Sequence, residues 1–378
     1  MVRLCFGSVY ASYCGGIKNF MQYLKIGPIK IPYQIKTEGD KKIFRIAGIK
    51  IPFSTYMKEH RKYYQLFGIS FRLPGMDKVF ITQSYSNYLM KDQLDDAKIE
   101  TIARQIFKEK LGYDLNLENP KTMNEKIFWL KLNYHNPLIT KCCDKFAVKD
   151  YVDERIGKGH VIPTIDCWEH AQDMDFSELP EKYVIKVNWS SGYNIIVKDS
   201  AKVNEKEIRE KVAHWMLPQQ NSYYQTFNWG YKHMKPTVYA EEYMEQFDGQ
   251  LYDYKFFCCN GKAKFLFIAT DRAQKSTLTY DFFDMDFNKL DFTYGGRGHA
   301  KAPLEKPKFF DEMVLCAEIL AEPFPFVRVD FYETEDNYYV GEMTFYSGGG
   351  ILPFEPREWD NRLGEYIDLS DLFNERKC

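Results

Sequence analysis

The sequence of 378 residues contains no long apolar run. A helix that crosses a membrane needs roughly 18 apolar residues in succession, and residues 4–14 are interrupted by Gly, Ser and Tyr. The same interruption argues against a cleaved signal peptide. We therefore expect a cytoplasmic globular protein, and its 45% hydrophobic and 28% charged residues are enough for two or three domains with their own cores.

The sequence also lacks the cysteine and histidine patterns of disulfide-bonded and zinc proteins. Its nine Cys are an odd number, none forms a Cys-x-x-Cys pair, and two pairs are adjacent in sequence, where a disulfide would be strained. Its seven His show no His-x-x-x-His spacing. These absences favour a reducing compartment and argue against a zinc site.

Negative charge is scarce at the N-terminal end. Residues 1–80 hold 14 Lys and Arg against 4 Asp and Glu, a net charge of +10, which leaves −12 for the remainder. No nucleic-acid-binding motif accompanies this charge, so we expect no nucleic acid partner. The segment suits peripheral contact with an anionic membrane, such as the inner face of the cell membrane, or an acidic polymer. A solvated basic face on a small β-rich cap is the alternative.

Periodicity divides the chain into four predicted parts. Residues 1–85 form a basic N-terminal extension, in which the strand-like phrases KIGPIKIPYQIK and RIAGIKIPF repeat a short theme. Residues 86–180 are mainly helical, with a capping box at Thr122–Glu125. Residues 181–245 and 246–378 mix strands, hairpins and helices, so the predicted fold class is α+β.

Two carboxylates are predicted on adjacent strands of a hairpin within residues 326–350. Phe326–Phe331 and residues 339–345 alternate with period two, and the polar residues between them read as a turn. One strand then carries Arg328 and Asp330, and the other carries Glu342 and Thr344. Paired acids beside an arginine suit a metal ion bound to nucleotide phosphates. An ordinary salt bridge on a solvated hairpin is the alternative.

A second candidate site surrounds Lys186, which lies in the apolar strand YVIKV. A buried lysine without a partner would be costly there, although a lysine on an edge strand would be harmless. The loop that follows, Asn188–Asn194, is small and polar but is flanked by strands, so it is not a Walker-type loop. It is predicted to fold over phosphates as a flap.

Five phrases in order resemble the TupA-like branch of the ATP-grasp superfamily, over roughly residues 100–365. They are CDKFAVKDYV, YVIKVNWSSGYNIIV, DYKFFCCNGKAKFLF, FPFVRVDFY and YVGEMTFYSGGG. The branch is named for teichuronopeptide biosynthesis and occurs in loci for cell-surface polysaccharides. The resemblance implies two α+β lobes that grip ATP, preceded here by the basic β-rich extension.

The resemblance also implies a role for each candidate residue. Lys145 and Lys186 would reach the phosphates of ATP, and Ser190, Ser191 and Gly192 would belong to the flap. Glu241, Glu242, Tyr243 and Met244 would form the strand that binds adenine and ribose. Asp330 and Glu342 would bind Mg²⁺ with Thr344, which stands where most of the superfamily has asparagine. Arg328 would stabilise developing charge, and Lys255 and Arg297 are further catalytic candidates.

The implied activity is ATP-dependent ligation of a carboxylate to an amine through an acylphosphate. The substrates would be a sugar acid of a surface glycan and an amino acid or amine. Sequence leaves open a kinase on the same fold, a glycosyltransferase, and a non-catalytic glycan- or membrane-binding module.

Overall fold

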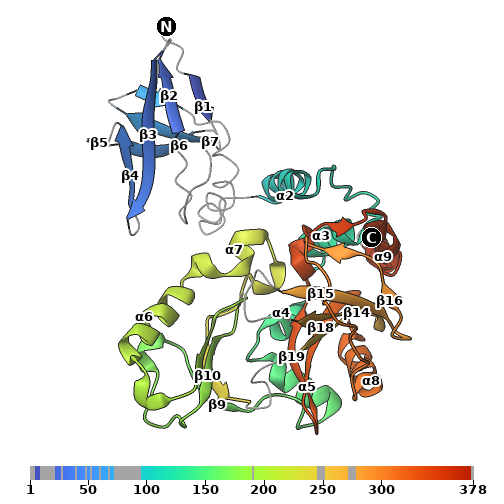
Figure 1. Ribbon diagram of the computed structural model, residues 1–378. Helices are drawn as coiled ribbons and strands as arrows, with labels where there is room; N and C mark the ends of the chain where they lie inside the picture. Colours follow the sequence, from blue (N-terminus) through green and yellow to red (C-terminus); the bar gives the residue numbers. More distant parts are fainter. Residues whose placement is uncertain are drawn as a thin grey trace. The chain divides into compact units, whose positions relative to one another are not determined.

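The computed structural model describes residues 95–189, 191–244, 252–270 and 278–375, apart from four side chains, together with the backbone of strands between residues 5 and 71. The contacts divide the chain into two compact units, Met1–Ser86 and Asn87–Cys378 (Figure 1). Each unit is described by itself. Among the described residues, none of the helices has the length and apolarity needed to span a bilayer.

The first unit consists of short antiparallel strands, most of which follow one another after two residues. A five-stranded sheet has the order β1-β2-β3-β4-β5, and a three-stranded sheet has the order β6-β7-β8. The strands are β1 (Cys5–Ser8), β2 (Gln22–Ile26), β3 (Ile29–Glu38), β4 (Lys41–Ile46), β5 (Ile49–Ile51), β6 (Phe53–Lys58), β7 (Arg61–Leu66) and β8 (Ile69–Phe71).

The second unit begins with helices that the sequence marks clearly. Asp95 caps α2 (Asp96–Leu111), which ends at Gly112 in a left-handed conformation. Thr122 and Glu125 form the predicted capping box of α3 (Met123–Asn133). Two shorter helices follow, α4 (Pro137–Cys143) and α5 (Val148–Ile156).

A four-stranded antiparallel sheet with the order β11-β10-β12-β9 forms one lobe of the second unit. Its strands are β9 (Thr164–Trp168), β10 (Tyr183–Val187), β11 (Asn194–Val197) and β12 (Val238–Glu242), and it is accompanied by α6 (Glu205–Trp215) and α7 (Ser222–Thr226). In β10 the side chains of Tyr183, Ile185 and Val187 are buried, whereas Val184 and Lys186 are half-buried. The two-residue period therefore places Lys186 on the opposite face from the core residues of the strand.

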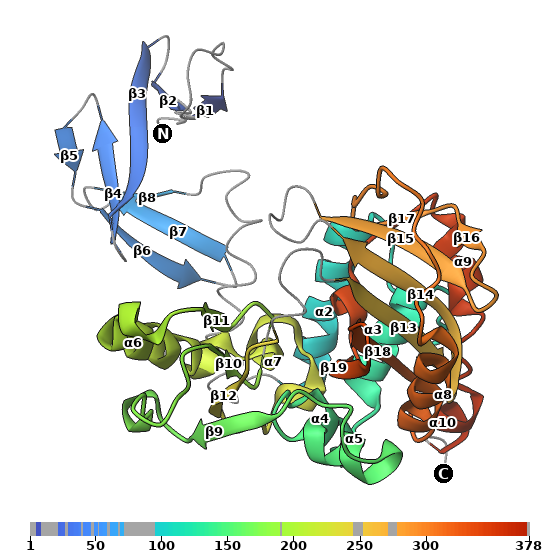
Figure 2. The same cartoon turned by 60° about the horizontal axis from the view of Figure 1, so that its bottom comes forward.

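A six-stranded antiparallel sheet with the order β16-β15-β14-β13-β18-β19 forms the other lobe. The strands are β13 (Asp253–Cys259), β14 (Lys262–Thr270), β15 (Thr279–Asp284), β16 (Lys289–Leu290), β18 (Phe326–Glu333) and β19 (Tyr338–Thr344). Helix α8 (Phe310–Ala321) covers one face, and Figure 2 shows it against β13, β14 and β18. Phe256 and Phe331 belong to that face, with ring centroids 5.6 Å apart.

The C-terminal elements close this lobe. They are a 3₁₀ turn η6 (Ser347–Gly350), the two-stranded sheet of β17 (Thr293–Tyr294) and β20 (Phe354–Glu355), and the helices α9 (Glu358–Gly364) and α10 (Ser370–Glu375). Asp360 of α9 accepts hydrogen bonds from the backbone N–H and side-chain amide of Asn124 and from Tyr113. The buried network therefore ties the end of the chain to α3.

Candidate functional site

The hairpin of β18 and β19 brings the predicted acid pair together. Asp330 is paired in register with Glu342, and Arg328 with Thr344. The guanidinium of Arg328 donates to both oxygens of Asp330, over 2.6 and 2.7 Å, and to the hydroxyl of Thr344 over 3.1 Å. Both Arg328 and Asp330 are buried. The hairpin is therefore not the solvated surface that its polar residues also allowed.

Lys255 adds a second cation to Asp330. Its strand β13 pairs with β18 so that Lys255 lies directly opposite Asp330, and its ammonium contacts that carboxylate and, at 3.3 Å, the carboxylate of Asp253. Burial alone would lower the pKa of Lys255, but the charges of Asp253 and Asp330 outweigh burial and raise that pKa. Lys255 is therefore held as a buried cation.

Lys145 joins the hairpin from the turn between α4 and α5. Its ammonium lies 3.0 Å from Oε2 of Glu342. Burial would raise the pKa of Glu342, but the charges of Lys145, Lys255 and Arg328 outweigh burial and hold that pKa well below its usual range. The predicted phosphate ligand and the predicted metal ligand thus form an ion pair.

Glu241 holds a second pair of lysines. Lys186 contacts one of its carboxylate oxygens, and the ammonium of Lys149 lies 3.1 Å from the other. Lys149 also donates to the carbonyl of Ile162 and the hydroxyl of Thr164. The side chain of Glu241 is only 4% exposed. Glu241 is therefore occupied by lysines, whereas the neighbouring Glu242 is exposed.

Asn188 connects these two groups of charges. Its side-chain amide donates to Asp144 over 2.6 Å and to the carbonyl of Lys235 over 2.9 Å, and its carbonyl oxygen accepts the N–H of Thr237. Its backbone carbonyl accepts the N–H of Lys145. Asn188 thereby fixes the turn that carries Lys145 against the end of strand β10, which carries Lys186.

The predicted flap lies between β10 and β11. Ser190 is outside the described residues, and Ser191 and Gly192 are exposed. Tyr193 anchors the far side of the loop because its ring stacks on Trp215 at 5.1 Å and its hydroxyl donates to Gln220. The anchored end leaves an exposed tip, as a phosphate flap requires.

The turn η6 supports Arg328 from behind the hairpin. The hydroxyl of Ser347 lies 3.1 Å from Nη1 of Arg328. Burial raises the pKa of Tyr294 to about 12, and the neighbouring Ser347 and Arg328 oppose this rise. Arg297 forms a β-bridge with Tyr294. The predicted catalytic Arg297 therefore lies on a loop whose base contacts the site, and its own role stays a prediction.

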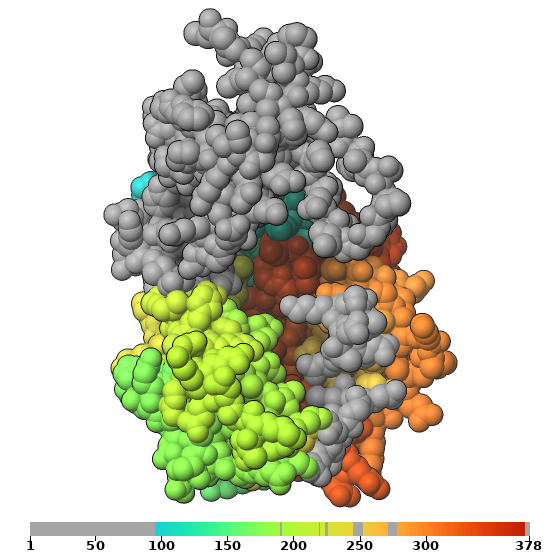
Figure 3. Space-filling model, turned by 60° about the vertical axis from the view of Figure 1, so that its left-hand side comes forward, coloured from blue at the N-terminus to red at the C-terminus, as the bar shows by residue number. Residues whose placement is uncertain are grey.

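The net positive charge of the site is too small to neutralise a bound triphosphate without further cations. Five cations face four carboxylates, namely Lys145, Lys149, Lys186, Lys255 and Arg328 against Glu241, Asp253, Asp330 and Glu342. A polyphosphate therefore needs further positive charge, which divalent ions supply in phosphoryl-transfer sites. Figure 3 shows a recess on this unit between the green-to-yellow lobe and the orange strands, with the red C-terminal part of the chain as its floor.

The residues present fit Mg²⁺ on the side of Glu342. Its side chain is 31% exposed, and its Oε1 lies 3.3 Å from the hydroxyl of Thr344, which are oxygen donors of the kind Mg²⁺ takes. Asp330 is 3% exposed and already bound by Arg328 and Lys255. Asp330 would therefore bind a metal only if one of these cations moved. Within the described ranges, no three His, Cys, Asp or Glu gather into a metal site by themselves.

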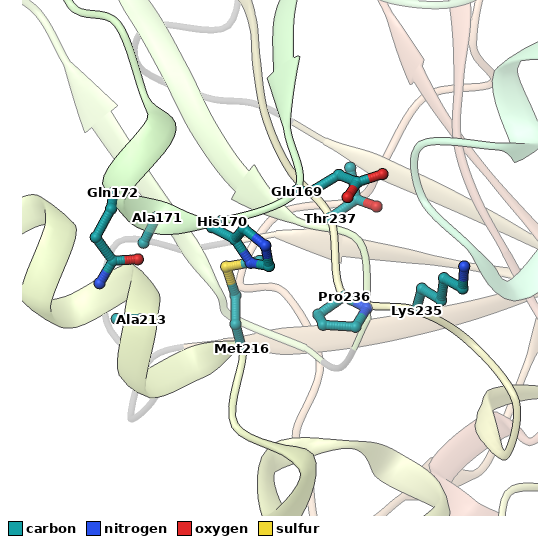
Figure 4. Close-up of a pocket in the computed structure, with 9 residues that line it drawn as sticks. All are labelled: Glu169, His170, Ala171, Gln172, Ala213, Met216, Lys235, Pro236 and Thr237. Atoms are coloured by element: carbon teal, nitrogen blue, oxygen red, sulfur yellow. The ribbon is translucent and has the colours of Figure 1, made fainter.

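A separate pocket lies beside α6. It has a volume of about 340 Å³ and is lined by Ala213 of the helix, by Met216 directly after it, by residues 169–172 and by residues 235–237 (Figure 4). None of the five cations and four carboxylates of the site lines this pocket. Its wall at residues 235–237 provides the backbone groups that Asn188 binds.

Comparison with known proteins identifies the family. A sequence model described as TupA-like ATPgrasp matches residues 125–368, which is more than half of the chain. The chain belongs to the TupA-like ATP-grasp family. This membership confirms the resemblance found in the sequence and the α+β ATP-grasp fold. A search of curated proteins found no match.

Solved structures similar to this ATP-grasp protein are distant. A D-alanine–D-alanine ligase from Bacillus anthracis complexed with ATP is 17% identical, with a TM-score of 0.31 and 57% coverage of each chain. The ATP-grasp ligase PsnB complexed with its minimal precursor, Mg and ADP is 10% identical, with a TM-score of 0.34 and coverage of 78% and 76%. This chain thus spans little more than half the length of the D-alanine–D-alanine ligase.

Sequence reasoning missed Lys149 and Ser347 as residues of the site, and it placed Asn188 only in the flap loop. Lys149 follows Lys145 by four residues, which was a readable signal, because the two would share one face of a helix. In the structure α5 begins only at Val148, so Lys145 lies in the preceding turn and the two lysines bind different carboxylates. Asn188 and Ser347 act through contacts between distant segments, which no local pattern announces.

Proposed function

We propose that this protein is an ATP-dependent carboxylate–amine ligase of cell-surface polysaccharide biosynthesis, which joins a sugar acid to an amino acid or amine. The observation that carries the proposal is the alternation of lysines and carboxylates from Lys186 and Glu241 to Lys145 and Glu342. These ion pairs are preformed contacts that an incoming triphosphate and metal would exchange for their own. The polysaccharide role rests on the likeness to TupA-like proteins.

In the proposed reaction the substrate carboxylate attacks the γ-phosphorus of ATP and ADP leaves. The amine then attacks the acyl carbon, the bond to the phosphate oxygen breaks, and phosphate leaves. Lys145 and Lys186 would hold the phosphates, since a flexible ammonium is a good phosphate ligand. Arg328, fixed by Asp330 and Ser347, would face the charge that develops on the acyl group.

Mg²⁺ bound by Glu342, Thr344 and Asp330 would neutralise phosphate charge and orient the γ-phosphoryl group. The exposed flap at Ser191 and Gly192 would exclude water from the acylphosphate. Glu242, Tyr243 and Met244 would line the nucleoside end, and Arg297 would meet an anionic substrate.

The test is to incubate the full-length protein with Mg²⁺-ATP and a panel of uronic acids and amines, and to measure ADP release and product mass. We expect ADP release that needs both a carboxylate and an amine, and a product heavier by an amide condensation. ADP release that ignores the amine, with a phosphorylated sugar as product, would instead identify a kinase. No ATP binding at all would mean a non-catalytic module.

A further inference from the structure

The first unit is built from a hairpin that occurs three times. Strand pairing ends at Ile26 and Ile29, at Ile46 and Ile49, and at Leu66 and Ile69, so that corresponding residues lie 20 positions apart. Each copy has an aliphatic residue, two connecting residues that include glycine, and isoleucine. The third copy is not obvious in the sequence because Ser70 and Phe71 replace Lys50 and Ile51.

The register of the five-stranded sheet separates charged from apolar residues. Neighbours across β1 to β5 share a face when they are paired, and alternate residues along a strand share a face. One face, here called the basic face, carries six cations and one acid, Lys25, Lys30, Lys36, Lys41, Arg45 and Lys50, with Glu38, beside only two large apolar residues, Tyr23 and Ile43. The opposite face carries eleven large apolar residues and Lys42: Phe6, Leu24, Ile26, Ile29, Ile31, Tyr33, Ile35, Phe44, Ile46, Ile49 and Ile51.

This separation decides which face meets an apolar environment. Burying six cations with only one acid in a protein core would cost more free energy than the packing of the sheet could contribute. The basic face is therefore the one suited to water or to an anionic partner.

The cations of the basic face are spread in two dimensions. They occupy four adjacent strands, β2 to β5, which lie about 4.8 Å apart, and successive residues on one face of a strand are about 7 Å apart. A single anionic polymer chain needs a line of cations. A field of cations across four strands suits a planar array of negative charges.

We infer that the basic face of residues 22–51 docks this protein on the surface of a membrane that contains anionic lipids. Each Lys or Arg near such a surface contributes about 1 kcal/mol of attraction, so six cations give useful binding without any inserted helix. The inference does not depend on the reaction catalysed by the second unit.

The experiment compares full-length proteins that carry single charge reversals on the two faces. Lys36→Glu lies on the basic face and Lys42→Glu on the apolar face, and both change the net charge by the same amount. Lys206→Glu on α6, an exposed position in the second unit, is the second control. Each protein is sedimented with vesicles of phosphatidylcholine alone or with 30% phosphatidylserine, and its thermal unfolding checks the fold.

We expect the wild-type protein to bind the phosphatidylserine vesicles and not the neutral ones. Lys36→Glu should weaken binding about fivefold or more, and Lys30→Glu combined with Lys36→Glu should weaken it further. Lys206→Glu and any folded Lys42→Glu protein should bind like the wild type. Because the Debye length is about 8 Å at physiological salt, binding should fall steeply as salt rises.

Three results would overturn the inference. Equal losses for Lys36→Glu and Lys206→Glu would mean that net charge alone matters. Absence of binding to phosphatidylserine vesicles at low salt would mean that the basic face is only solvated. Tighter binding to polygalacturonate than to the vesicles at equal charge concentration would assign the face to a polymer instead.

Discussion

Glu241, Asp330 and Glu342 each contact two cations, but these carboxylates differ in how freely they could exchange them. Asp330 is almost fully buried, and Arg328 and Lys255 occupy its oxygens, so that removing its charge would leave two buried cations unpaired. Glu342 is partly exposed, and its main partner is the flexible Lys145. Glu342 is therefore the residue on which metal binding is tested with least damage to the fold.

Glu342→Gln should lower turnover about 100-fold or more while the protein remains folded, because a neutral amide cannot offset metal charge as a carboxylate does. Asp330→Asn should abolish turnover too, with a loss of stability. Steady-state ADP release checks both variants. Glu335→Gln, an exposed position in the turn of the same hairpin, is the matched control. Near-normal activity of Glu342→Gln would remove the metal assignment.

Lys186→Ala should weaken ATP binding by on the order of 1–3 kcal/mol, which is the range for leaving a charged group without its partner. The fold should tolerate the change because Lys149 still neutralises Glu241. Calorimetric titration with ATP measures the effect, and Lys202→Ala, at an ammonium that is 84% exposed, is the control. An unchanged affinity would mean that Lys186 only balances Glu241.

Lys131 lies in the helical phrase IFWLKL and is buried, which the sequence pattern did not predict. Its ammonium donates to the carbonyl of Gly349 over 2.6 Å and lies 4.2 Å from the ring centroid of Phe128. Burial lowers the pKa of Lys131 to about 7. Between about pH 7 and the unfolded value near 10.5, the unfolded chain therefore binds more protons than the folded one, and stability rises with pH.

The free energy of unfolding should consequently increase from pH 7 to pH 10 by up to about 1.4 kcal/mol per pH unit from this group. Lys131→Met keeps the length of the side chain and removes the titration, so its stability should change less over the same range. Urea unfolding of both proteins at pH 6.5, 8 and 9.5 gives the comparison. Parallel curves for the two proteins would show that Lys131 stays charged in the fold.

At the scale of elements, the turn η6 links a helix of the second unit, α3, to Arg328 of the candidate site. The hydroxyl of Ser347 contacts Arg328, and the backbone carbonyl of Gly349 accepts a hydrogen bond from Lys131 of α3. Gly348 has φ of +57°, and a Cβ placed there would lie 2.2 Å from the hydroxyl of Tyr294. The turn thus requires glycine both for its backbone conformation and for its close packing.

Gly348→Ala should destabilise the protein by about 1–3 kcal/mol and also lower turnover, because the turn must shift away from Tyr294 and would carry Ser347 with it. Gly112→Ala is the matched control, since Gly112 has φ of +81° and open space around the missing Cβ. That control should lose stability without losing specific activity. Thermal unfolding and ADP release separate the two effects. Equal specific activity in both variants would show that η6 does not position Arg328.

Elements with a local signal were predictable from the sequence. Three such predictions are confirmed: the capping box at Thr122, the strand Tyr183–Val187 and the pairing of Asp330 with Glu342. Helix caps and two-residue periods depend on residues that are close in sequence, so the sequence alone reveals them. Strand β9, which runs from Thr164 to Trp168, has no such local signal. Its limits are set by pairing with β12, which is a contact between distant segments.

The site itself was predictable only as a set of residues. The resemblance named Lys145, Lys186, Arg328, Asp330 and Glu342, and the structure brings them into two linked groups of ion pairs. Which carboxylate each lysine binds depends on how the two lobes of the second unit meet, and Asn188 shows this most clearly, because it joins Asp144 to the segment before β12. Contacts of this kind cannot be predicted from the periodicity of neighbouring residues.

At the scale of the whole molecule, the two units divide the predicted tasks. Every charged residue of the candidate site lies between residues 144 and 342, inside the unit Asn87–Cys378. The repeated hairpins and the six cations of the basic face lie inside the unit Met1–Ser86. Nucleotide binding and membrane binding should therefore be separable by shortening the chain.

A protein that begins at Asn87 should bind Mg²⁺-ATP with a dissociation constant within about twofold of the full-length value, because none of the residues proposed to hold the nucleotide is removed. It should no longer sediment with phosphatidylserine vesicles, because it loses a segment with a net charge of +10. Thermal unfolding with and without ATP checks both folding and binding, since a ligand that binds the folded state raises its unfolding temperature. If the shortened and full-length proteins sediment alike, the membrane contact belongs to the second unit. If the shortened protein folds but no longer binds ATP, residues 1–86 are part of the ligase site, and the division of tasks between the two units is wrong.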